Sequence, residues 1–169
     1  VKAIEPRQTV SGAKVLSVVI DNDGAYQTVP GFGEKRDYKN LTPQEIRDII
    51  KDAGIVGMGG AGFPTHVKLT PKNPNDIEYI LVNAAECEPY LTSDYREMLE
   101  EPEKLVGGLR IVLSLFPDAE GLICIENNKP AAVAVLNELI KNDKNISIKV
   151  LKAKYPQGAE RNLVYAAVG

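Results

Sequence analysis

Short apolar segments alternate with amphipathic segments along the second half of the chain. Three segments rich in aliphatic residues, 77–82, 122–125 and 146–151, have the length and composition of buried strands. Between them, residues 102–116 and 130–140 repeat apolar side chains at helical spacing, and each segment begins with a proline, as many helices do. Such alternation is typical of parallel βαβ units with right-handed crossovers. The sequence therefore predicts an α/β fold with a parallel sheet and flanking helices.

Each predicted strand is followed by a cluster of polar residues. The clusters are Asn83–Tyr90, Glu126–Lys129 and Lys154–Glu160. The carboxyl ends of parallel strands lie at one edge of a sheet, and ligands of such sheets bind there. A single polar loop would not indicate a site, but three at one edge predict a ligand-binding cleft.

Residues 57–62 contain four glycines and lead directly into Phe63 and Pro64. Glycine tolerates positive φ and close approach of a ligand, and free amides in such a loop can bind phosphate oxygens. The segment lacks the Gly-Lys-Ser/Thr ending of a Walker loop, and it follows a predicted helix where a dinucleotide fingerprint requires a strand. A usual Rossmann NAD site is therefore not expected here. The residues alone leave open a phosphate-binding loop and a purely structural turn.

The first part of the chain predicts two smaller pieces and a helix. Residues 1–24 contain β-branched segments and a turn sequence, which indicate two short strands. Residues 25–41 contain proline, glycine and charged residues without periodicity, as a linker does. A helix is predicted between the Thr42–Glu45 capping box and Gly54, a typical residue after a helix end.

Charge and cysteine content exclude some classes of protein. The net charge of −3 and the pI near 5.3 argue against a nucleic-acid partner. No apolar run approaches the roughly 20 residues that span a bilayer. Cys87 and Cys124 are isolated and suggest neither a disulfide nor a metal-ligand pair, so we expect a soluble domain in a reducing compartment. The chain begins at Val1 without an initiator methionine, and we expect it to be a fragment of a longer polypeptide.

Four motifs in order resemble the C subunit of the Rnf electron-transport complex. They are residues 57–68, 83–90, 125–130 and 154–160. A more distant resemblance links the region to the FMN- and NADH-binding flavoprotein subunit of respiratory complex I. The resemblance implies that residues 41–169 form a Rossmann-like domain that binds FMN and exchanges electrons with NAD(H). It also implies that residues 1–40 are the remnant of a barrel-sandwich hybrid module followed by a linker.

The resemblance assigns roles to individual residues. The flavin would be bound by the glycine loop, by a lysine beyond it and by residues after the first and third strands: Gly57, Gly59, Gly60, Gly62, Lys68, Asn83, Glu86, Tyr155 and Gly158. Glu160 matches a catalytic position beside flavin and nicotinamide, in a Tyr-x-x-Gly-Glu-Glu segment. Ala159 replaces the first of those glutamates, so the nicotinamide contact is incomplete.

Other side chains have simpler interpretations. A cation beside the N1–C2 edge stabilises the reduced flavin ring, as Lys68 could, although without the resemblance Lys68 would be an ordinary solvated lysine. We expect Phe63 to pack into the core and Cys87 to be a small buried packing residue.

The function implied by the resemblance is that of an oxidoreductase. The chain would be part of the peripheral C subunit of an Rnf-type ferredoxin:NAD oxidoreductase, which couples electron transfer to ion translocation at the cytoplasmic face of the membrane. Its partners would be the other subunits of the complex, NAD(H) and, indirectly, ferredoxin. Iron–sulfur clusters are expected only beyond Gly169, so the fragment alone is expected to be inactive. A related cobalamin reductase subunit and a docking scaffold with an unused flavin site remain alternatives.

Overall fold

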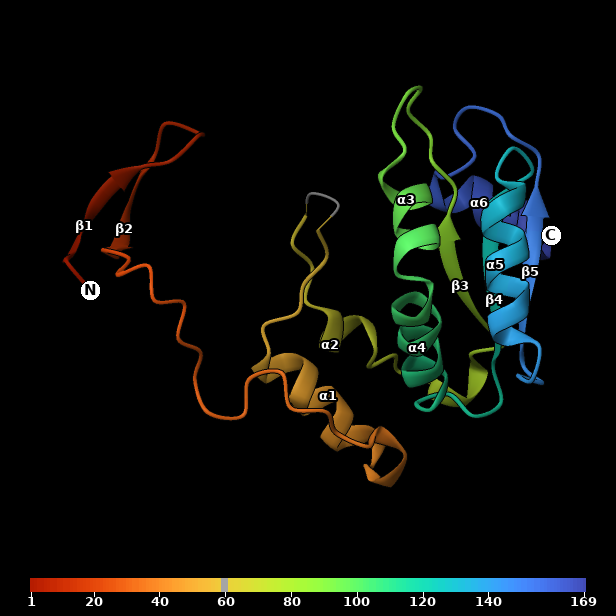
Figure 1. Cartoon of the computed structure of the whole chain (residues 1–169), viewed down its shortest axis with the longest axis horizontal. Helices are drawn as coiled ribbons and strands as arrows, with labels where there is room; N and C mark the ends of the chain where they lie inside the picture. The colour runs from red at the N-terminus through yellow and green to blue at the C-terminus, as the bar shows by residue number, and fades with distance from the viewer. Residues whose placement is uncertain (59–60) are drawn as a thin grey trace. The chain divides into compact units, whose positions relative to one another are not determined.

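A computed structural model describes residues 1–58 and 61–169 and contains two compact units, Val1–Arg36 and Asp37–Gly169 (Figure 1). The predicted loop residues Gly59 and Gly60 lie outside the described residues. The first unit is an antiparallel hairpin of β1 (Ala3–Gln8) and β2 (Lys14–Val19), which confirms the two short strands.

The second unit contains the remaining elements. In chain order they are η1 (Tyr38–Asn40), α1 (Pro43–Asp52), α2 (Thr65–Lys68), η2 (Pro74–Asp76), β3 (Tyr79–Ala84), α3 (Ser93–Glu100), α4 (Pro102–Leu113), β4 (Glu120–Glu126), α5 (Pro130–Ile140), β5 (Ile146–Leu151) and α6 (Glu160–Val168). None of the described helices is long and apolar enough to cross a membrane.

The predicted limits of α1 are confirmed. The Thr42 side chain accepts a hydrogen bond from the Glu45 amide, and the Glu45 carboxylate accepts one from the Thr42 amide at 2.7 Å. This capping box satisfies amides that have no partner within the helix. Gly54 follows the helix with φ +66°, a conformation that glycine adopts at little cost.

The sheet of the second unit is parallel, in the order β3-β4-β5, as the sequence predicts. Side chains alternate between its faces. Ile123 and Ile125 pack in a core cluster with residues of α3, α4 and α5, whereas Leu122 and Cys124 pack in another with residues of α6. Figure 1 shows α3, α4 and α5 on one side of the sheet and α6 on the other. The connections after β3 and β4 therefore share one face, and the chain changes face after β5.

Several details differ from the sequence prediction. Strand β4 begins at Glu120, two residues before its predicted start, and α4 ends at Leu113 instead of Phe116. Helix α3 lies in a stretch for which no element was predicted, and strand β3 begins at Tyr79 and ends at Ala84, two residues later than expected. Strands continue while a neighbour pairs with them, and Asn83 is still opposite Cys124. Asn83 and Glu126 are thus strand residues at the ends of β3 and β4 instead of loop residues.

Candidate functional site

A cavity of about 380 Å³ lies at the carboxyl edge of the sheet, where the three predicted polar clusters meet. Its lining comes from residues 86–92 after β3, from Glu126, Asn128 and Lys129 at the end of β4, and from Lys154 and Tyr155 after β5. The parallel sheet places these segments together, as expected for a ligand cleft in an α/β fold. Tyr155 is 74% exposed and lies at the cavity with an accessible aromatic face.

Glu86 is held by contacts from two segments, the start of α3 and the residue before α5. One carboxylate oxygen accepts hydrogen bonds from the amides of Asp94 and Tyr95 at the start of α3, at 3.0 and 3.4 Å. The other lies 2.5 Å from the Lys129 ammonium group, which is also 5.1 Å from the centre of the Tyr95 ring. Both charged side chains are almost fully buried. Glu86 therefore takes the place of a capping side chain for α3 and fixes the loop after β3.

Asn83 and Gly158 bring the first and third clusters into contact. The Asn83 side-chain amide donates to the Gly158 carbonyl at 2.7 Å, and the Gly158 amide donates to the Cys87 sulfur at 3.2 Å. A Cβ atom at position 158 would lie only 2.5 Å from the Ala85 carbonyl oxygen. Gly158 is thus required by close packing of two loops. Cys87 is half-buried and accepts a hydrogen bond, so its interpretation as a simple packing residue is incomplete.

Gln157 is a buried polar residue whose side-chain amide lacks partners. The residue is 1% exposed, and neither its side-chain nitrogen nor its oxygen has a hydrogen-bond partner in the described part of the chain. A buried amide without partners costs about 1–3 kcal/mol. An orphaned amide in the loop that lines the cleft fits a polar cofactor at this edge of the sheet.

The glycine-rich loop is closed at its base by backbone hydrogen bonds. The Gly57 amide donates to the Phe63 carbonyl at 2.8 Å, and the Thr65 amide donates to the Ile55 carbonyl at 3.1 Å. Gly62 has φ +61°, whereas Gly57 does not have a positive φ. The Gly57 amide is therefore engaged in closing the loop and is not free to bind phosphate. Phe63 is 53% exposed, so the expectation that it packs into the core is wrong.

Lys68 and Glu160 do not line the 380 Å³ cavity. Lys68 is exposed at the end of α2 and borders a different, mostly apolar cavity of about 470 Å³ between α2, β3 and α4. Glu160 is the exposed first residue of α6 and follows the loop that contains Tyr155 and Gly158. Of the predicted residues, the structure joins Asn83, Glu86, Tyr155 and Gly158 at one sheet edge.

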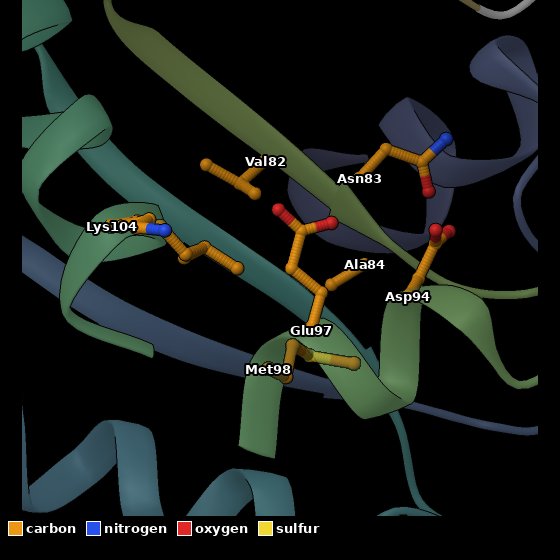
Figure 2. A pocket seen from close by; sticks show the side chains of 8 residues that line it. Val82, Asn83, Ala84, Asp94, Glu97, Met98 and Lys104 are labelled. Atoms are coloured by element: carbon orange, nitrogen blue, oxygen red, sulfur yellow. The ribbon is translucent and has the colours of Figure 1, made fainter. Parts of the chain in front are cut away.

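A third cavity, of about 290 Å³, lies between β3, α3 and the start of α4. Figure 2 shows the Glu97 carboxyl group pointing from α3 toward β3, with Asp94 on the side of Asn83. Lys104 borders the same cavity. The sequence did not predict that Asp94, Glu97 and Lys104 lie together, because it did not predict α3.

Two residues at the 380 Å³ cavity belong to a polar cluster that the sequence placed at the cleft, but no individual role was predicted for either of them. Lys129 and Glu126 lie in a motif that the resemblance includes, but their part in the cavity depends on contacts across the sheet edge. The available signal was their position at the carboxyl end of a predicted strand.

The fold and the cavity define an α/β domain with a cavity at the carboxyl edge of a parallel sheet, the edge where ligands of such folds bind. Residues 50–169 match the model of the Nuo51 FMN-binding domain family, and the chain belongs to this family.

Two curated relatives agree with the resemblance to the Rnf complex. The chain is 42% identical over 156 residues to the C subunit of the proton-translocating ferredoxin:NAD(+) oxidoreductase complex of Clostridium ljungdahlii, an alignment that covers 92% of this chain and 34% of that protein. It is 40% identical over 167 residues to the C subunit of the Na(+)-translocating ferredoxin:NAD(+) oxidoreductase complex of Acetobacterium woodii, covering 99% of this chain and 38% of that protein. The chain thus spans somewhat more than a third of the length of these relatives.

Solved structures support the fold. The crystal structures of an NAD+-reducing [NiFe]-hydrogenase in the air-oxidized and H2-reduced states match with TM-scores of 0.60 and 0.61. Both share 24% sequence identity with this chain and cover 73% and 75% of it, and 23% and 24% of the hydrogenase chain. The α/β fold predicted from the sequence is confirmed.

Proposed function

We propose that the chain is the FMN- and NAD(H)-binding part of the peripheral C subunit of an Rnf-type ferredoxin:NAD oxidoreductase. The observation that carries this proposal is the cavity at the carboxyl edge of the sheet, in a chain about 40% identical to relatives of this name. Membership of the Nuo51 FMN-binding domain family supports flavin as the ligand. When bound, FMN would accept two electrons as hydride from NADH and pass them on singly.

The residues divide into those that would contact FMN and those that hold the loops. Tyr155 would contact the ring system with its exposed aromatic face. Asn83 and Gly158 fix the two loops against each other, and Glu86 fixes the loop after β3 through α3 and Lys129. These satisfied contacts favour positioning roles. In this proposal Glu160 lies beside the flavin and the nicotinamide.

The glycine loop would hold the phosphate end of the flavin. Its residues Gly57, Gly59, Gly60 and Gly62 are those that the family resemblance assigns, with Lys68 one helical turn beyond. Because the Gly57 amide already closes the loop, other amides of the loop would bind the phosphate in this proposal. Lys68 adds a positive charge in the following helix.

The wider setting is also part of this proposal. The complete subunit would carry iron–sulfur clusters outside these residues and would lie at the cytoplasmic face of the membrane beside the other subunits. Ferredoxin would exchange electrons with the flavin indirectly, through those clusters and subunits.

The test is isothermal titration of the full-length protein with FMN and with riboflavin. FMN should bind about tenfold or more tightly, because phosphate adds charge-assisted hydrogen bonds. Equal affinities would reject the phosphate assignment. If neither flavin binds, the proposed function is wrong and the domain is a scaffold.

A further inference from the structure

Glu126 is a buried acidic residue at the centre of the sheet edge. It is the last residue of β4, the middle strand, and it is opposite Leu151 of β5. The residue is 4% exposed, and it lines the 380 Å³ cavity. Strand alternation places it on the same face as Leu122 and Cys124. Its carboxyl group thus lies at the sheet edge where ligands of α/β folds bind.

The Glu126 carboxyl group has no hydrogen-bond or ion-pair partner among the residues at 1–58 and 61–169. The nearby cation, Lys129, is committed to Glu86 at 2.5 Å, and the Asn127 side chain accepts from the Ala153 amide at 3.0 Å. The Glu126 oxygens are not among the fully buried side-chain atoms that lack a partner, so they are open to the cavity, where a hydrogen-bond donor of a ligand can reach them. The contrast with the satisfied Glu86 suggests that the partner of Glu126 is a ligand in the cavity.

The chemistry of the cavity limits that ligand. A carboxylate accepts hydrogen bonds and repels anions, so a phosphate group is disfavoured beside Glu126. Neutral hydroxyl groups are suitable donors. Asn128 and Tyr155 also border the cavity and can both donate and accept hydrogen bonds, which suits a chain of several hydroxyls.

We propose that Glu126 binds the hydroxyl groups of a five-carbon sugar chain and orients it with its phosphate directed away from β4. Two sources share this chemistry, the ribityl chain of the flavin and the ribose of NAD(H). The proposal rests on the proposed function, and it adds a residue that determines both orientation and selectivity for a hydroxylated chain.

The test measures binding of lumiflavin, which lacks the ribityl chain, and of riboflavin, which has it, to the full-length protein. With Glu126→Ala, riboflavin should bind about tenfold or more weakly, because a hydrogen bond to a charged group is lost. Lumiflavin affinity should not change. Glu126→Gln keeps the side-chain volume and one acceptor oxygen, so it should fold normally and lose less riboflavin affinity. NADH titration of the same variants forms the second arm, since a weaker NADH affinity with unchanged flavin affinities would assign the ribose.

Glu103→Ala is the matched control, because Glu103 carries the same charge but is exposed at the start of α4 and does not border the 380 Å³ cavity. It should leave the lumiflavin, riboflavin and NADH affinities unchanged. Equal weakening of lumiflavin and riboflavin by Glu126→Gln, an equal effect of Glu103→Ala, or no change for any ligand would overturn the role of Glu126 while the flavin site stands. If the unmodified protein binds neither the flavins nor NADH, the proposed function fails and this inference fails with it.

Discussion

Gly158 is fixed by the space around it, not by its backbone conformation. A Cβ atom there would lie 2.5 Å from the Ala85 carbonyl oxygen and 2.9 Å from the Cys87 sulfur. The Gly158→Ala variant should therefore lose about 1–3 kcal/mol of the free energy of unfolding, as overpacked sites do. Urea denaturation measures this. Gly107→Ala is the control, since nothing lies within 4 Å of its added Cβ in α4, and it should stabilise the protein by about 0.5–1 kcal/mol. If Gly158→Ala were as stable as the unmodified protein, the loops after β3 and β5 would be free to move apart and the close packing at Gly158 would not be required.

Cys124 is another residue whose surroundings determine its chemistry. It is fully buried, and burial raises the pKa of its thiol, with Lys149 opposing the shift. The unfolded chain therefore releases this proton before the folded chain does as the pH rises. The protonated Cys124 thiol therefore makes its full contribution to the free energy of unfolding below the ordinary thiol pKa. Above that pKa the free energy of unfolding falls. The free energy of unfolding relative to Cys124→Ala should shrink from about pH 8.5 upward. Parallel pH profiles of the two proteins would contradict the effect of burial.

At the scale of elements, the Glu86–Lys129 pair links the end of β3, the start of α3 and the start of α5. Glu86→Gln leaves Lys129 buried without its partner, and such a loss costs about 3–5 kcal/mol. The double variant Glu86→Gln/Lys129→Met should lose less than the sum of the single variants. Thermal and urea denaturation measure both.

An exposed pair supplies the control for this cycle. Arg96 and Glu100 lie one turn apart on α3, and both side chains are more than half exposed. Arg96→Met should change the stability by less than about 1 kcal/mol. Strict additivity in the Glu86–Lys129 cycle would show that the two residues act independently.

Elements with local signals were predictable, and contacts between distant segments were not. The Thr42–Glu45 capping box and the prolines at 102 and 130 mark the starts of α1, α4 and α5, and those starts are confirmed. Helix α3 has no side-chain cap of its own, because Glu86 from outside the helix satisfies its first amides. The start of α3 therefore carries no cap signal in its own sequence, and its only local pattern is the helical spacing of Tyr95, Met98 and Leu99.

The candidate site also has features that were predictable from the sequence and features that were not. Strand order and the polar clusters predicted the cleft at the sheet edge. The packing of Gly158 against Ala85 and the unpaired state of Glu126 depend on the folded chain. The extension of β3 through Asn83 depends on pairing with β4, which the sequence of β3 does not contain.

At the scale of the whole molecule, the two units differ in what they can do independently. The hairpin unit Val1–Arg36 is a two-stranded ribbon with exposed apolar side chains such as Leu16 and Ile20. Two strands alone are marginally stable in water. The unit Asp37–Gly169 contains the parallel sheet and both core clusters. We therefore expect the second unit, Asp37–Gly169, to bind the ligand without the hairpin unit.

The two cysteines of this chain limit its capacity to pass electrons to another protein, because they are too few to hold a four-iron cluster. A four-iron cluster normally takes four cysteine thiolates, and the chain has only Cys87 and Cys124. Cys124 is fully buried, Cys87 accepts a hydrogen bond beside the cavity, and no metal-binding group of His, Cys, Asp or Glu occurs among the described residues. Anaerobic reconstitution of residues 1–169 should therefore yield no stoichiometric iron or acid-labile sulfide. Flavin-dependent NADH oxidation should appear only with small dyes that reach the flavin directly, because a protein that accepts single electrons would need a cluster as relay. Stoichiometric iron that is lost when Cys87 or Cys124 becomes serine would contradict this limit.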